Sequence, residues 1–180
     1  MNMIQLAKQL RASLERVFGS AALVRLGPPQ VDEIPDRRAV VFVIPIGYRD
    51  FGGVTADGAR ITRRPAALDS PAEGFAEERP GRLVVEIRCL AADYQQMHKL
   101  CSAIGVQVLR VLESTRTVTL SQAPDDAGYL RFADFQASLY EQAFSSEPLE
   151  RRQPHSARLV FHLDGFLHVQ MKDPNLTYHT

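Results

Sequence analysis

The amino-acid sequence predicts an α+β fold, with two main helices packed on a mostly antiparallel sheet. The clearest observation lies between Arg82 and Glu113, where a hydrophobic period of two residues changes to one of 3.6. The ranges 38–46 and 158–171 also have the composition of strands, and a second helical stripe begins the chain. Together these patterns indicate strands that share one core with two helices.

Composition bounds the class of protein. The chain has 180 residues, which fits one domain with a real core, and it is 45% hydrophobic and 23% charged. Lys+Arg and Asp+Glu number 21 each, so no net charge attracts nucleic acid or an anionic membrane. No apolar run approaches the roughly 18 residues that a membrane-spanning helix needs. We expect a single domain over residues 1–171 and a loose tail over 172–180.

The first element is an expected helix that begins after Asn2, a residue suited to cap it, and ends at Gly19. One face of this helix is expected to be buried, because apolar residues repeat at helical spacing: Met3, Leu6, Leu10, Leu14 and Val17. Residues 21–34 then predict a short extended segment followed by a loop.

The next element is a strand over Arg38–Ile46, expected to be buried on both faces because 39–44 is apolar throughout. Pro45 cannot donate to a ladder, so the strand either ends there or borders a sheet edge. Residues 47–81 hold many glycines and prolines and show no sustained period, which predicts a long irregular exposed loop.

The strand and helix that follow the loop share one core. Apolar residues alternate along one strand face, and a helix over 94–113 carries its stripe from Met97 onward. Asp93 is suited to cap this helix, with Gln96 completing a capping box. Cys89 and Cys101 fall on the two core faces, so we expect buried free thiols.

Two later segments leave alternatives. Residues 116–122 have the composition of a strand and 124–128 that of a turn, whereas the apolar residues of 129–144 suit a helix and a strand equally. In the last element, 158–171, Asp164-Gly165 resembles a hairpin turn. The odd-numbered positions are apolar both before and after this dipeptide, however, whereas a hairpin would place them on opposite faces. This constant pattern favours a single strand bent at Gly165.

Candidate chemistry is sparse. His162 and His168 would lie roughly 20 Å apart on one strand, or on opposite faces of a hairpin, so they cannot share a metal ion. The sequence has no G-x-S-x-G and no phosphate-binding loop. We therefore expect no catalytic, cofactor-binding or metal-ligating residues, and no enzyme activity.

The order of elements resembles that of bacteriophage tail terminators and of the related tail-capping proteins of contractile injection systems. The correspondence is closest for RLVVEIRCLAADYQQMHKLCSAIGVQVLRVLES and RLVFHLDGFLHVQM. The resemblance implies a structural protein that caps the tail tube as a six-membered ring, ends its growth and joins it to the neck or head. The implied partners are other copies and the tube, sheath or neck proteins, with no membrane and no specific nucleic acid. The implied location is the bacterial cytoplasm during assembly, then the virion or tail-like particle.

A ring subunit must present two different patches, because ring contacts are heterologous. We expect one patch at the sheet edge near Arg38–Ile46 and the other in the loop. The residues assigned to this protein interface are Val40, Phe42, Arg60, Arg63 and Arg64. The alternative is an intracellular α+β adaptor or binding module without catalysis.

Overall fold

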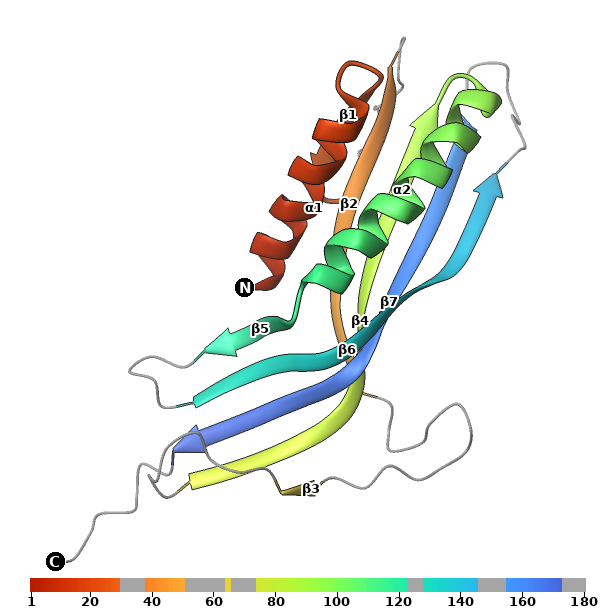
Figure 1. The fold of residues 1–180 in the computed structure, drawn as a ribbon. Helices are drawn as coiled ribbons and strands as arrows, with labels where there is room; N and C mark the ends of the chain where they lie inside the picture. The colour runs from red at the N-terminus through yellow and green to blue at the C-terminus, as the bar shows by residue number, and fades with distance from the viewer. Residues whose placement is uncertain (30–37, 51–63, 66–73, 123–127, 146–154, 173–180) are drawn as a thin grey trace, which may run out of the picture.

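A sheet with two helices on one face makes up the computed structural model (Figure 1). The model describes residues 1–29, 38–50, 64–65, 74–122, 128–145 and 155–172. Its elements, in chain order, are α1 (Met3–Phe18), β1 (Ala22–Leu26), β2 (Ala39–Asp50), β3 (Arg64–Pro65), β4 (Gly74–Ala91), α2 (Tyr94–Ser114), β5 (Thr117–Gln122), β6 (Gly128–Ser145) and β7 (His155–Lys172).

The strand order is β1-β2-β4-β7-β6-β5, with β3 beside β4. β1 and β2 are parallel, and the other pairings between the described strands are antiparallel. α1 packs on β1 and β2, whereas α2 packs on β4, β7 and β6. Both helices cover the same face of the sheet (Figure 1), and a hydrogen bond from Gln107 to Ser13 joins them. This arrangement confirms the predicted α+β class.

The helix starts follow local chemistry. Asn2 and Gln5 form a capping box, in which each side chain accepts the other residue's backbone N–H at 2.8 Å. Asp93 caps α2 as predicted, but its carboxylate accepts from the N–H of Gln95 at 2.9 Å. A capping box would need the N–H of Gln96, so the predicted box is replaced by a simple cap.

The core lies between the helices and the facing side of the sheet. Alternate residues of β2, β4 and β7 pack against the apolar faces of α1 and α2. Cys89 and Cys101 are buried free thiols within this core, as expected. Val17 was predicted to lie on the buried face of α1, but it is 49% exposed. Phe18 is buried instead, because it lies four residues after Leu14 and continues the buried stripe.

The segment 47–81, predicted as an irregular loop, is strand at both ends. β2 continues through Pro45 to Asp50, and β4 begins at Gly74. Proline is tolerated within β2 because β1 ends opposite Val43, so that Pro45, which has no N–H, lies just beyond the β1 ladder. A register shift between Pro45 and Gly47 lies next to it. Pairing with β7 makes a strand of 74–81 although its sequence lacks alternation.

Residues 51–63 and 66–73 lie outside the described part of the chain, as do 124–127 of the predicted turn and 173–180 of the predicted tail.

The two open alternatives are resolved as strands. β6 is a strand throughout, and β7 is one 18-residue strand, which confirms the single-strand interpretation of 158–171. The long strands curve near their middles (Figure 1), where Gly81 faces Gly165. A Cβ at Gly165 would lie 2.7 Å from the carbonyl oxygen of Ala133 and from Cα of Phe135, so only glycine fits this bend.

Candidate interface on the sheet face and edges

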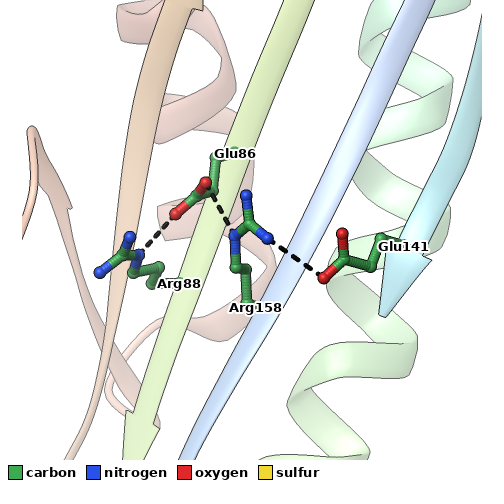
Figure 2. A network of polar contacts seen from close by, with 4 residues as sticks. All are labelled: Glu86, Arg88, Glu141 and Arg158. Atoms are coloured by element: carbon green, nitrogen blue, oxygen red, sulfur yellow. Dashed lines mark hydrogen bonds and ion pairs between the residues drawn. The ribbon is translucent and has the colours of Figure 1, made fainter. Parts of the chain in front are cut away.

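The sheet face away from the helices carries a polar network across three strands. Figure 2 shows Glu86 between two guanidinium groups, with bonds of 2.5 Å from Arg88 and 2.9 Å from Arg158. Arg158 also bonds Glu141 at 3.1 Å, so the network links β4, β7 and β6. With two acidic and two basic side chains, it is balanced in charge and holds the three strands in register.

The Glu86 side chain is 5% exposed although it is charged. Burial alone would raise the pKa of its carboxyl, but hydrogen bonds from Arg88 and Arg158 outweigh that effect and lower the pKa below its ordinary value. The carboxylate is therefore ionised at neutral pH. Its role is structural, because both of its oxygen atoms are engaged by arginines of the fold.

A second cluster surrounds Tyr140. A register shift between Leu139 and Glu141 lies at this residue, which is 65% exposed. Its ring stacks on His162 with centroids 4.0 Å apart. The Arg82 guanidinium lies 5.9 Å from the Tyr140 centroid and forms two hydrogen bonds with Asp164, at 2.5 and 2.9 Å. The cluster presents an aromatic ring and a cation at the surface.

His162 is buried, at 7% exposure, which the sequence pattern did not indicate. Burial lowers the pKa of His162, and the nearby Arg82 charge lowers it further. The signal missed in the sequence is the bulge at Tyr140, which no regular period reveals. His168 lies six residues away beside Asp134, at 3.8 Å, and within the described residues no group of three or more His, Cys, Asp or Glu could hold a metal ion.

The sheet has two unlike edges. β5 pairs with β6 only as far as Ala133, so from Asp134 to Ser145 β6 has β7 on one side and no other described strand. On the opposite side of the sheet, β1 pairs with β2 alone among the described strands. Apolar side chains are exposed at both edges, with Leu23 at 41% and Leu26 at 38% on β1 and Leu139 at 36% on β6.

The interface residues predicted from the sequence are not brought together as one described surface. The sheet edge expected near Arg38–Ile46 lies at β1 instead, because β1 pairs with β2 over 39–43. Val40 and Phe42 lie on β2, facing away from the helices, and are 7% and 1% exposed. Arg64 is in β3, where its backbone pairs with Glu78, whereas Arg60 and Arg63 lie outside the described residues. The assignment of these five residues to an interface stays a prediction.

Comparisons with known proteins complete the description. Within the described part of the chain, no helix combines the length and apolar character needed to cross a membrane. No protein-family model matches the sequence, and no curated protein matches it. The fold is similar to a solved structure titled "Cryo-EM Structure of an Extracellular Contractile Injection System, PVC sheath/tube terminator in extended state", with a TM-score of 0.41 and 14% identity. The match covers 100% of this chain and 60% of that chain, so this chain spans less than two thirds of its neighbour's length.

Proposed function

We propose that this chain is a structural assembly protein that caps a phage or phage-like tail tube as a ring, most simply a hexamer. The cap ends tube growth and joins the tube to the neck or head. The observation that carries the proposal is the pair of unlike sheet edges, β1 on one side and residues 134–145 of β6 on the other. A closed ring needs two different patches on each subunit, because every contact joins one patch to the other.

Exposed strand edges give a physical reason for assembly. An unpaired edge presents free backbone N–H and C=O groups and invites pairing with another chain. Here the two edges are far apart on the same sheet, with exposed leucines on β1 and on β6. A ring would cover both edges at once, and this explains how a folded subunit can keep them.

The chemistry of the sheet face agrees with a role based on contact. Its charged groups neutralise one another in the network around Glu86 and in the Arg82–Asp164 pair. We propose that the chain has no catalytic activity. Its partners are other copies and the tube, sheath or neck proteins, without a membrane or a specific nucleic acid. It assembles in the bacterial cytoplasm before it joins the particle.

A second candidate is a binding module that works without ring formation. It is favoured by the cluster of Tyr140, Arg82 and His162, because tyrosine and arginine are enriched at the energetic centres of protein interfaces. In this case Tyr140→Ala would weaken partner binding, whereas the chain would stay a monomer.

The proposed function is tested by measuring solution mass over a range of concentrations, alone and with tube subunits encoded in the same gene cluster. The expected result is a species of six times the 20.1-kDa subunit mass, seen by electron microscopy as a ring at the tube end. Tubes assembled with the protein should stop growing. A chain that stays monomeric with tubes present, while the tubes elongate unchanged, would refute the cap.

A further inference from the structure

We infer that neighbouring subunits of the proposed ring join by strand pairing, with residues 141–145 of β6 antiparallel to β1 of the next copy. The sheet would then continue from subunit to subunit around the ring. This inference rests on the proposed function, which makes the occupant of each edge a second copy of the chain. Strand polarity, the level of the edges and the chemistry of the facing side chains support it.

The polarity of the edge strands favours this pairing. β1 is parallel to β2, and each step from β2 to β4, β7 and β6 is antiparallel. β1 and β6 therefore run in opposite directions. A rotation about an axis along the strands preserves these directions, so β1 of the next copy meets β6 in the antiparallel orientation, which needs no inversion of the subunit.

The two edges also match in their level along the strands. The register across the sheet runs from Leu23 through Val40, Leu90 and Ser156 to Ser145. The edges therefore lie at the same level along the strands. When the strands run along the ring axis, this match lets the ring close, because cyclic symmetry has no translation along the axis, whereas strands tilted to the axis would need a stagger.

The side chains that would face one another across the contact are compatible. With no stagger, the residues of the two copies that lie opposite one another, here called rungs, are Leu23–Ser145, Val24–Phe144, Arg25–Ala143 and Leu26–Gln142. Val24 is buried in the helix-covered core, and Phe144 contacts Tyr94 and His98 of α2, so this rung joins apolar groups on the same face. The core of one subunit would continue into the next.

Charge is also complementary across this contact. In the paired segments, β1 has one basic residue, Arg25, and residues 141–145 have one acidic residue, Glu141. The register places them as diagonal neighbours on the face away from the helices, a distance at which long side chains interact. Neither 22–26 nor 134–145 contains lysine or proline, the residues that commonly protect an edge from pairing.

The inference predicts the size of the ring. At the level of β1 each subunit contributes five strands, β1, β2, β4, β7 and β6. With about 4.8 Å between strands that run along the axis, six copies close at a diameter of about 45 Å between strand centres. Electron microscopy of the ring measures this diameter directly.

Disulfide trapping tests the rungs. One variant combines Arg25→Cys with Ala143→Cys, and a second combines Leu26→Cys with Gln142→Cys. Adjacent antiparallel rungs alternate between hydrogen-bonded and non-hydrogen-bonded pairs, so the two variants sample both geometries. Within one subunit the paired positions lie at opposite edges of the sheet. Cross-links therefore join different chains and should form a ladder up to hexamer on non-reducing gels.

The matched control combines Arg25→Cys with Ser138→Cys. Ser138 is exposed on the same strand, but it lies about 16 Å along β6 from the predicted partner. Cys89 and Cys101 are present in every variant and give the same background. The control should not form a ladder, and neither should any single-cysteine variant.

Each outcome separates the hypotheses. Rings that form without a ladder in either rung variant would overturn the strand pairing and leave the proposed cap intact. A covalent dimer from Ala143→Cys alone would indicate pairing of β6 with β6 and would also overturn it. A wild-type chain that forms no ring, even with tubes, would overturn both proposals.

Hydrogen exchange of the unmodified protein provides a measurement that does not depend on the folding of variants. When rings form, the amides of residues 22–26 and 141–145 should exchange at least about tenfold more slowly. Unchanged exchange at both edges in assembled rings would contradict the pairing.

Discussion

At the scale of single residues, Gly165 decides whether the long strands can bend. A side chain at this position would meet backbone atoms of β6, which cannot move away as a flexible side chain could. We predict that Gly165→Ala lowers the free energy of unfolding by about 2 kcal/mol or more, measured by urea denaturation.

Gly105 provides the matched control for this substitution. It lies within α2, and an added Cβ would be 4.0 Å from Leu139, an ordinary contact. Gly105→Ala should therefore raise the free energy of unfolding by about 0.5–1 kcal/mol, because alanine favours the helix. Equal effects at the two glycines would contradict this explanation of the bend.

Glu86 links residue chemistry to pH. The pKa of its carboxyl is lowered in the folded chain, because the hydrogen bonds from Arg88 and Arg158 outweigh the effect of burial. The ionised carboxylate therefore stabilises the fold fully at pH values above 4.5, the ordinary pKa of this group. This stabilisation is lost as the pH falls from 4.5 through the lowered pKa of the folded chain.

We predict that Glu86→Gln costs about 1.5–3 kcal/mol at pH 7, the range for hydrogen bonds to charged groups. The loss should shrink as the pH falls from 4.5 through the lowered pKa, because the wild-type carboxyl then becomes protonated as well. Thermal unfolding from pH 3 to 7 measures both effects. Glu15→Gln removes an exposed i,i+4 pair with Arg11 and should cost less than about 0.5 kcal/mol at every pH. A Glu86→Gln loss that stays constant with pH would contradict the assignment.

At the scale of elements, the start of α2 separates two kinds of cap. The Asp93 carboxylate bonds the N–H of Gln95, so Asp93→Ala should cost about 1 kcal/mol of unfolding free energy. Gln96→Ala should change it by less than about 0.5 kcal/mol, because the Asp93 cap does not use Gln96. Chemical denaturation measures the unfolding free energy of both variants. An equal loss in the two would support the capping box predicted from the sequence.

A test at the same scale concerns Arg60, Arg63 and Arg64, whose interface role stays a prediction. A deletion of 52–78 would remove Gly74–Glu78, which pair with β7, and would confuse loss of fold with loss of contact. Replacing 52–62 with a Gly/Ser linker of equal length removes Arg60 and leaves β2, β3 and β4 complete, and Arg63→Ala and Arg64→Ala remove the other two side chains.

At the scale of the whole molecule, ring formation couples stability to concentration. A ring forms only from folded chains, so mass action stabilises them by up to about 1.4 kcal/mol per tenfold increase in concentration. For a chain of this size the melting temperature should rise by about 3–5 °C per tenfold increase. Differential scanning calorimetry measures this rise. A melting temperature independent of concentration would indicate a monomer and would contradict ring formation.

The sequence by itself determined the features that depend on local chemistry: both helices with Asn2 and Asp93 as caps, the strand over 83–91, the buried cysteines, and the single final strand, whose constant parity a hairpin would break. Only the tertiary structure decided that β2 passes Pro45, that 74–81 and 129–144 are strands, and that His162 lies beneath Tyr140. The physical reason is that β4 and β6 obtain their ladder from β7, which is distant in the sequence. Strand order likewise determines which edges stay open, and no local periodicity encodes that order.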